Sequence, residues 1–393
     1  MRTFEHVRVW QELGAEITVL TCAPNFPQGK VYPGYRNRLY SRRREDGVDV
    51  VRVWSYVSAN AGFAKRILDY CSYAVAATLA SLALSFDVVV ATSPQFFTAV
   101  AGRAVGALRG RPWIMEVRDL WPESIRAVGA ARGPELLLDA LERLELALYR
   151  SARSVVVVTD SFRQNLIARG IDAAKVHVVT NGVDTTLYSP SAKPAGLASE
   201  LGVADKLVVA YVGTHGMAHG LDFVLDCAGS APPHVHFLFV GDGAEKRRLT
   251  AQRERLGLTN VTLLAPVPKA EVARYLALAD VALVPLRRRD TFKSVIPSKI
   301  FESAASGTPI LLGVEGESRA IVERHAAGLA YVPEDRESFL TQLSALANDA
   351  ELYRRCRRGC ADLAAAYDRR VLATRMYSIL VDEAQPASKP SYA

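Results

Sequence analysis

The sequence predicts an α/β protein with two doubly wound domains, each holding a parallel sheet covered by helices on both faces. Its 393 residues exceed what one ordinary hydrophobic core accommodates. Apolar, β-branched runs alternate with helical patterns from end to end, which is typical of parallel sheets. Residues 181–196 are rich in Asn, Gly, Ser and Pro, and they indicate a join between two such sets.

The first half begins with a helical pattern, because Phe4, Val7, Trp10 and Leu13 recur at helical spacing. Six strands are expected after it, at 16–22, 48–54, 87–92, 112–117, 154–159 and 176–180. A parallel sheet needs a strand before the opening helix, and the first strand of a doubly wound sheet is usually central. We therefore expect that a first strand and its glycine-rich turn are missing. Either Met1 is not the natural start, or the chain as written is inactive.

The second half shows the same alternation. Its expected strands are 207–213, 235–241, 260–264, 280–284, 308–312 and 329–332. Before the fifth of these lies the stretch IPSKIFESAASGTPIL, in which Ser298 is expected to cap a short helix and Gly307 to end it. In open α/β sheets ligands bind beyond the carboxyl ends of the strands, so the site is expected in a cleft between the two domains.

Composition narrows the class of protein. Hydrophobic residues make up 50% of the chain and charged residues 23%, as in globular proteins. The five cysteines contain no CxxC pair, which favours reduced thiols over disulfides or zinc and indicates a cytoplasmic setting. Residues 1–16 lack the apolar core of a signal peptide. Polar residues dilute the apolar stretch 67–86, so a buried helix is favoured there over a membrane span.

The net charge of +7 is locally concentrated. Residues 35–46, YRNRLYSRRRED, hold five arginines, and Lys65 and Arg66 follow. Most such runs are solvated loops. The sharper hypothesis is a patch within the basic 36–44 region for an anionic lipid surface or phosphates. Nucleic acid is a weaker candidate, because no recognised nucleic-acid motif accompanies the charge.

Glycine-spaced loops follow two strands of the second half. Gly213, Gly216 and Gly220 permit close approach of the backbone to a ligand, and the next helix offers free N–H groups to an anion. His215 and His219 could donate to a phosphate or could equally be exposed loop residues. A second loop brackets Asp242 between Gly241 and Gly243, and the loop at 266–268 could offer an apolar wall to a flat base. Each could also be an ordinary turn between a strand and a helix.

Lys299 and Glu302 fall in the first turn of the short helix at 298–306. Glu302 could simply complement the helix dipole. If the loop at 213–220 holds a diphosphate, however, a carboxylate nearby must address neutral donors, and a ribose diol provides two hydroxyls. Lys299 would then be the compact counter-charge for the phosphates. Together these features indicate a nucleotide site.

The second half resembles family 4 glycosyltransferases of the GT-B fold in FLFVGDGAEKRRL, YLALADVALVPL and PSKIFESAASGTPIL. The first half is similar to the bacterial branch that builds surface polysaccharide and O-antigen, including transferases for fucosamine-type sugars. That likeness rests on RTFEHVRVWQELGAEITVLT, NFPQGKVYPGYRNRLY and IMEVRDLWPESIRAVGA. The resemblance covers nearly the whole chain.

The resemblance implies two Rossmann-like domains: an acceptor-side domain over 1–182, a nucleotide-sugar-binding domain over 183–368, and a helix over 369–385 that packs back on the first. It implies retaining transfer of a hexosyl- or N-acetylhexosaminyl-type sugar, most often from UDP, with no cofactor and no bound metal. The residues expected to bind the nucleotide-sugar are Gly213, Thr214, His215, Gly216, Gly241, Asp242, Gly243, Val267, Lys293, Ser298, Lys299 and Glu302.

The chain departs from the family pattern in three places. Glu302 matches the second glutamate of the family's pair, but Ser294 stands where the first would contact the donor sugar. The first phosphate loop carries Thr214 and histidines where the family tends to have arginine and lysine, which leaves Lys299 and Lys293 to neutralise charge. The glycine-rich loop after the first strand is absent together with that strand.

The stretch EVRDLWPES, 116–124, follows a strand end in the first domain, where the fold places its site. Arg118, Asp119 and Glu123 are the candidate catalytic residues. They could orient acceptor hydroxyls or the donor sugar, with Trp121 as a stacking face. The alternative is a plain helix start, which Pro122 suits. In a retaining transfer of this kind the leaving phosphate can take the acceptor's proton, so no general base is named.

The sequence thus predicts a cytoplasmic glycosyltransferase, peripheral at the inner face of the plasma membrane, that acts on a lipid-linked or saccharide acceptor. A nucleotide-sugar epimerase of similar architecture remains open, but no carboxylate and histidine set for acid–base work at the sugar can be placed. A truncated, inactive nucleotide-binding homologue also remains open. A Rossmann oxidoreductase is the least favoured, because no GxGxxG follows an early strand.

Overall fold

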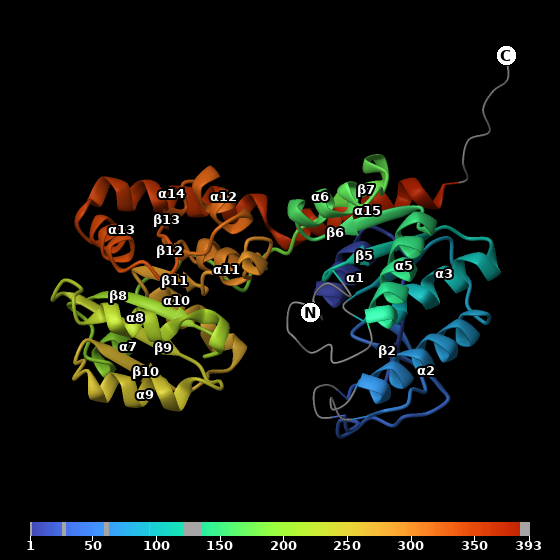
Figure 1. Cartoon of the computed structure of the whole chain (residues 1–393), viewed down its shortest axis with the longest axis horizontal. Coiled ribbons are helices and arrows are strands. Elements are labelled where there is room, and N and C mark those ends of the chain that lie inside the picture. Colours follow the sequence, from blue (N-terminus) through green and yellow to red (C-terminus); the bar gives the residue numbers. More distant parts are fainter. Residues whose placement is uncertain (1, 26–28, 59–62, 94, 121–134, 386–393) are drawn as a thin grey trace, which may run out of the picture. The chain divides into compact units, whose positions relative to one another are not determined.

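The computed structural model describes residues 2–25, 29–58, 63–93, 95–120 and 135–385. The chain forms two compact units. Unit 1 comprises Met1–Thr180 and Leu372–Ala393, and unit 2 comprises Asn181–Val371. In both units parallel strands form sheets flanked by helices, so the predicted α/β class with two doubly wound domains is confirmed (Figure 1).

Unit 1 holds two sheets. Its strands are β1 (Thr18–Cys22), β2 (Tyr40–Glu45), β3 (Val48–Val53), β4 (Val89–Thr92), β5 (Trp113–Val117), β6 (Ser154–Val157) and β7 (Val176–Val178). Its helices are α1 (Arg2–Glu12), α2 (Phe63–Ser81), α3 (Phe97–Arg109), α5 (Glu135–Ser151), α6 (Asp160–Ala168), the 3-10 helix η1 (Ala173–Lys175) and most of α15 (Arg369–Ala384). One sheet has the order β1-β3-β2 and the other β4-β5-β6-β7. All six strands expected in this half are present.

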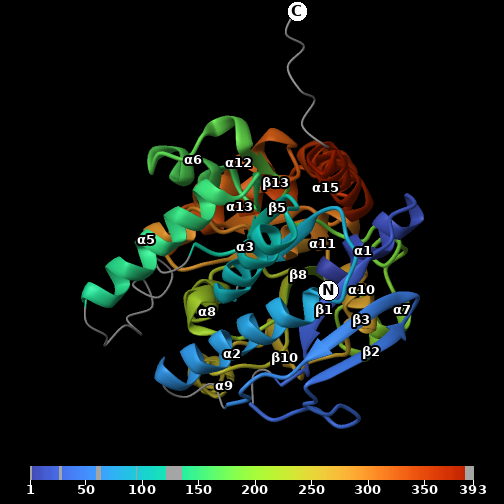
Figure 2. The same ribbon diagram turned by 90° about the vertical axis from the view of Figure 1, so that its right-hand side faces the viewer.

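Strand β2 was not among the expected strands, because the sequence left this arginine run as either a solvated loop or an anion-binding patch. It pairs antiparallel with β3, from Tyr40 opposite Val53 to Glu45 opposite Val48. Asp46 and Gly47 form the connecting turn with positive φ of 48° and 83°, the conformation that an Asp-Gly hairpin turn requires. The guanidinium of Arg52 also donates across the hairpin to both oxygens of Glu45, at 2.5 and 2.6 Å. Figure 2 shows β2 and β3 as a paired ribbon.

Both sheets of unit 1 share one hydrophobic core. In it, Val7 and Trp10 of α1 join Val48 and Val50 of β3 and Ile114 of β5. Three residues of α15 pack into the same cluster: Leu372, Met376 and Leu380. Among the described strands β1 pairs only with β3 and β4 only with β5, so no ladder hydrogen bonds join the sheets. The expectation that a strand is missing from this unit stays a prediction.

Helix α2 contains most of the apolar stretch 67–86, in which a buried helix was expected. No helix in the described part of the chain has the length and apolar character to cross a bilayer. One face of α2 packs in a core, through Ala74 and Ala77. The opposite face exposes Leu68, Val75 and Leu79 at helical spacing. The helix is therefore half-buried rather than fully buried.

Unit 2 holds one sheet of six parallel strands in the order β10-β9-β8-β11-β12-β13. These are β8 (Leu207–Val212), β9 (Val235–Val240), β10 (Val261–Leu264), β11 (Val281–Pro285), β12 (Ile310–Gly313) and β13 (Gly328–Ala330), which match the six expected strands. The chain leaves β8 towards one edge of the sheet and returns to β11 on its other side. Such a reversal opens a crevice at the carboxyl ends of the strands, where ligands bind in open α/β sheets.

The helices of unit 2 cover both faces of this sheet (Figure 1). They are α7 (Ala195–Glu200), η2 (Met217–His219), α8 (Leu221–Ala228), α9 (Lys246–Arg255), α10 (Lys269–Leu278), η3 (Asp290–Phe292), α11 (Lys299–Ala305), α12 (Glu317–Arg324), α13 (Arg336–Asn348) and α14 (Ala350–Ala366). Fully buried aromatic side chains fill the core between sheet and helices, among them Phe237, Phe301 and Phe339.

The short helix α11 follows the sequence prediction at its end but not at its start. Gly307 adopts a positive φ of 72° and donates its N–H to Ala304, so it ends the helix as expected. Ser298 does not cap the helix through its side chain. Its backbone is already helical, with φ −58° and ψ −25°, and a serine in that conformation does not turn its hydroxyl to the first free N–H groups.

Candidate functional site

A pocket of about 250 Å³ opens at the carboxyl ends of β8, β9 and β10. It is lined by Val212, Gly213, Thr214, Val240, Gly241, Asp242, Pro266, Val267 and Val272. Five residues expected to bind the nucleotide-sugar thus share one hollow: Gly213, Thr214, Gly241, Asp242 and Val267. The wall formed by Pro266, Val267 and Val272 is apolar, which suits the face of a flat ring.

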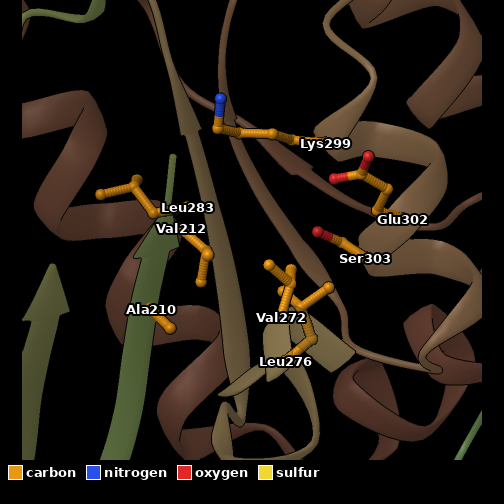
Figure 3. A pocket seen from close by; sticks show the side chains of 8 residues that line it. All are labelled: Ala210, Val212, Val272, Leu276, Leu283, Lys299, Glu302 and Ser303. Atoms are coloured by element: carbon orange, nitrogen blue, oxygen red, sulfur yellow. The ribbon is translucent and has the colours of Figure 1, made fainter. Parts of the chain in front are cut away.

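A second, much smaller space of about 10 Å³ lies beside the first, and the two share Val212 and Val272. Figure 3 shows its lining, with Lys299, Glu302 and Ser303 all projecting from α11. Lys299 and Glu302 therefore lie next to the pocket that holds the glycine loops. This brings the two charged residues of the predicted nucleotide site together with the two loops of that site.

The two glycine loops touch through their backbones. The His215 N–H donates to the Asp242 carbonyl at 2.8 Å, and the Glu245 N–H donates to the His215 carbonyl at 2.9 Å. A Cβ on Gly241 would lie 1.9 Å from the Gly213 oxygen. On Gly243 it would lie 2.5 Å from the His215 oxygen. Glycine is required at both positions because no side chain fits between the loops.

The side chain of Lys299 lies against the first glycine loop at Gly213. Its Nζ lies 5.1 Å from the centroid of the buried Tyr211 ring, a cation–π arrangement. Burial lowers the pKa of Lys299, and the charge of Glu302 opposes that shift. Burial raises the pKa of the Glu302 carboxyl. The positive charges of Lys299, Lys269 and Arg369 offset only part of that rise. Both groups are partly desolvated and so interact strongly with a polar ligand.

For His215, the structure excludes one of the two alternatives that the sequence left open, and donation to a phosphate stays a prediction. His215 is not an exposed loop residue, because none of its surface is exposed. Its ring nitrogens also make no hydrogen bond to any described residue. Burial is the main cause that lowers its pKa to about 4, so the ring is neutral near pH 7. The ring of His219 is half-buried and donates to the Pro285 carbonyl, and burial lowers its pKa to about 4 as well.

Five predicted binding residues lie outside both pocket linings: His215, Gly216, Gly243, Lys293 and Ser298. Lys293 is exposed and its Nζ pairs with Asp290 at 2.7 Å. Ser298 is exposed at the start of α11. Gly216 precedes the 3-10 helix η2 and is separated from the pocket lining by His215. The Ser294 hydroxyl donates weakly to the Thr291 carbonyl at 3.4 Å.

In unit 1, Arg118 and Asp119 follow the carboxyl end of β5. The Ser93 hydroxyl accepts hydrogen bonds from both of their backbone N–H groups, at 2.7 and 3.3 Å. Burial raises the pKa of Asp119, and Arg118 opposes the shift. Glu123 and Trp121, predicted for the same site, lie outside the described residues.

Sequence reasoning missed a buried ion pair beneath this loop. Arg2 of α1 donates to Glu116 of β5 at 2.8 Å, and the Thr92 hydroxyl donates to the other carboxylate oxygen at 2.5 Å. Burial alone would raise the pKa of Glu116, but Arg2 and Thr92 outweigh it and the pKa is lowered. The hint in the sequence was a glutamate inside the continuous apolar run of β5, since a buried carboxylate needs a partner.

Lys246 was also overlooked. It lies at the start of α9 and its Nζ donates to the carbonyls of Gly241 and Leu264, at 3.1 and 2.5 Å. These two hydrogen bonds link the second glycine loop to the end of β10. In the described part of the chain, no three His, Cys, Asp or Glu side chains lie close enough together to hold a metal ion.

Comparisons with known proteins agree with this architecture. Residues 2–182 match the family described as "Glycosyl transferase 4-like domain", and residues 206–349 match "Glycosyl transferases group 1". WcaI of Escherichia coli K12, named for colanic acid biosynthesis glycosyl transfer, is 26% identical over 77% of this chain and 76% of its own. TuaH of Bacillus subtilis 168, named for teichuronic acid biosynthesis, is 29% identical over 50% of this chain and 49% of its own.

A solved structure supports the fold. That of Anabaena HepE in complex with UDP and glucose has a TM-score of 0.63 and 20% identity, over 79% of this chain and 81% of that one. The fold, the glycine-loop site of unit 2 and the family matches together define a GT-B glycosyltransferase. The chain belongs to family 4 of these enzymes, and each of its units is a Rossmann-like domain.

Proposed function

We propose that this chain transfers a sugar from a UDP-linked donor, with retention of configuration, to a lipid-linked or saccharide acceptor in bacterial surface polysaccharide synthesis. The observation that carries the proposal is the 250 Å³ pocket bounded by two glycine loops, with Lys299 and Glu302 beside it. It offers an apolar wall, a cation and a carboxylate at one edge of one sheet. These are the three groups that a base, a diphosphate and a ribose need.

Each part of the nucleotide-sugar donor contacts a different group of the site. The base packs against Pro266 and Val267, and the Glu302 carboxylate accepts from the ribose hydroxyls. The diphosphate occupies the glycine loops near Lys299, the nearest cation that faces Gly213. The likeness to HepE, whose structure contains UDP and glucose, supports UDP as the nucleotide.

Arg118 and Asp119 act on the acceptor side, with Glu123 as a further candidate from the sequence alone. In the transfer, the bond from the sugar C1 to the diphosphate oxygen breaks and a bond from C1 to the acceptor oxygen forms. The leaving diphosphate takes the acceptor's proton, so the reaction needs no separate base. The names of WcaI and TuaH, given for two bacterial polysaccharides, support a surface polysaccharide as the product.

A surface of unit 1 supports peripheral membrane association. Arg42, Arg43 and Arg44 of β2 are exposed, and so are the aromatic side chains of Tyr32 and Tyr35. Exposed arginines with aromatic rings suit an anionic headgroup region. The apolar stripe on α2 adds a second exposed face that a bilayer surface would cover.

The test is a panel of nucleotide-sugars, read by mass spectrometry, with lipid-linked saccharides as acceptors. We expect free UDP and an extended acceptor only when both substrates are present. An epimerase would convert the donor sugar without an acceptor, and a non-catalytic homologue would bind UDP and change nothing. Either result would overturn the proposal. The variant Glu254→Gln, on the exposed face of α9, serves as an active control for protein quality.

A further inference from the structure

The imidazole of His215 is a buried polar group that the proposed donor contacts leave unused. None of its surface is exposed, and neither ring nitrogen has a partner among the described residues. A buried polar group without a hydrogen bond is costly, so such a group calls for an explanation. Here the residue lies in the loop that would hold the diphosphate.

The ring lies directly behind the pocket lining. A Cβ on Gly241 would come within 3.3 Å of its Nε2, and Gly241 itself lines the pocket. The residues before it in the loop, Gly213 and Thr214, line the pocket as well. Only backbone therefore separates the ring from that side of the pocket, and an anion bound there would act on it through a poorly screened medium.

The charged groups around the ring leave it short of negative charge. Lys246 from α9, His219 from η2 and Lys299 from α11 all disfavour a protonated ring, and Asp242 alone favours it. Tyr211 from β8 packs at 5.9 Å between ring centroids and carries no charge near pH 7, since burial raises its pKa. An added anion would reverse the balance.

We propose that His215 takes up a proton when the diphosphate of a nucleotide-sugar binds at the Gly213–Gly220 loop. This inference rests on the proposed function. The proton comes from solvent, and it turns the unpartnered ring into a second cation behind the loop. The site thus gains positive charge only when the ligand is present, where a permanent arginine would carry it always.

The direction of the pH effect follows. The pKa of the free ring is about 4, and the anion raises it in the complex. Donor affinity is therefore greatest below the pKa of the complex and declines as pH rises through it. If that pKa returns to the ordinary value of about 6.5, affinity falls roughly tenfold or more between about pH 5 and pH 7.5.

The experiment is isothermal titration calorimetry with UDP-glucose and UDP-N-acetylglucosamine at about pH 5.5, in two buffers of different ionisation enthalpy. Both phosphates of these donors are diesters, so the ligand brings no proton of its own to exchange near this pH. The slope of heat against buffer enthalpy gives the protons taken up. We expect at least about half a proton per donor. Binding with an uptake near zero overturns the inference and leaves the proposed function standing.

Two variants test whether His215 is the residue that takes up the proton. His215→Gln should abolish the uptake and flatten the pH dependence of affinity. His236→Gln is the matched control, a half-buried histidine of β9 that already contacts the Thr262 hydroxyl at 2.9 Å. It should keep the wild-type uptake. Uptake that persists in His215→Gln overturns the assignment.

If His215→Gln does not fold, histidine ring NMR of the wild-type chain with and without donor decides the matter. An imidazolium signal that appears only with donor supports the inference, and unchanged histidine signals overturn it. Failure of UDP and of both UDP-sugars to bind at any pH would instead overturn the proposed function.

Discussion

The ammonium of Lys299 and the ring of Tyr211 lie 5.1 Å apart, with Gly213 directly against the lysine side chain. Tyr211 is fully buried in β8, and its hydroxyl donates to the Thr214 carbonyl at 2.6 Å. One tyrosine therefore supports both the first glycine loop and the cation that faces it. The lysine stays beside the loop only because position 213 has no side chain.

This arrangement predicts different outcomes for alanine at two glycines. In Gly213→Ala the positive φ of 145° strains the backbone, but the new Cβ would lie 2.5 Å from Lys299 Cε, the flexible part of a side chain that can move away. We expect the protein to fold and to bind UDP about tenfold or more weakly, because a charge-assisted contact contributes roughly 1.5–3 kcal/mol. In Gly241→Ala the Cβ would lie 1.9 Å from backbone, which cannot move away. Donor binding should then be lost and the melting temperature should fall.

Calorimetry with UDP and a thermal melt measure both effects. Gly202→Ala is the control for backbone strain, because Gly202 also has a positive φ, of 66°, and no described atom outside its chain neighbours lies within 4 Å of an added Cβ. Equal losses of UDP affinity and of melting temperature in Gly213→Ala and Gly241→Ala would contradict this account.

Glu302→Gln should weaken donor binding about tenfold or more, since the amide loses one acceptor and the charge. The same change should not lower the melting temperature at pH 7. Burial raises the pKa of Glu302, so the folded state disfavours its ionised form and loses stability as pH rises through that pKa. A neutral isostere removes this loss. The exposed Glu254→Gln should change neither quantity, and an unchanged UDP affinity in Glu302→Gln would refute the ribose assignment.

Ser93→Ala should slow transfer without weakening donor binding. The hydroxyl holds the backbone N–H groups of Arg118 and Asp119, so its loss misplaces the loop and leaves two part-buried donors unpaired. We expect a lower kcat, UDP affinity within about twofold of wild type, and a stability loss of roughly 1–3 kcal/mol. Ser81→Ala removes another buried serine hydroxyl of unit 1, one that donates to Thr78. It should cost stability alone, and an equal fall in kcat in both variants would show that Ser93 is merely structural.

Reversal of three arginines on β2, with Arg42, Arg43 and Arg44 replaced by glutamate, should abolish binding to vesicles of anionic phospholipid. Binding of the wild-type chain should weaken steeply between about 0.05 and 0.5 M salt, because the Debye length falls over that range. The control reverses Arg354, Arg355 and Arg358, three exposed arginines of α14 in unit 2. Two results would contradict this prediction: vesicle binding that is unchanged by the β2 reversal, or binding that both reversals reduce equally. Either would show that the β2 arginines are ordinary solvated surface residues.

Local sequence determined the strands of all three described sheets, with the exception of the edge strand β2. Each of the twelve expected runs forms a strand, because continuous β-branched residues suit a sheet that is buried on both faces. It also determined the glycine loops and the spacing of Lys299 and Glu302, since residues three apart on a helix share a face. The edge strand β2 was missed because its arginines mask the strand pattern, although the Asp46–Gly47 pair is a hairpin signal.

Only the tertiary structure decided how the polar side chains are partnered. The pair of Arg2 and Glu116 joins residues 114 positions apart, which no local pattern encodes. Ser93 meets the loop after β5 because β4 and β5 are neighbours in the sheet. His215 reads as a loop histidine in the sequence, yet the fold buries it completely between two glycine loops. Burial and charge pairing depend on which segments meet in space, and they decide which of these groups are charged.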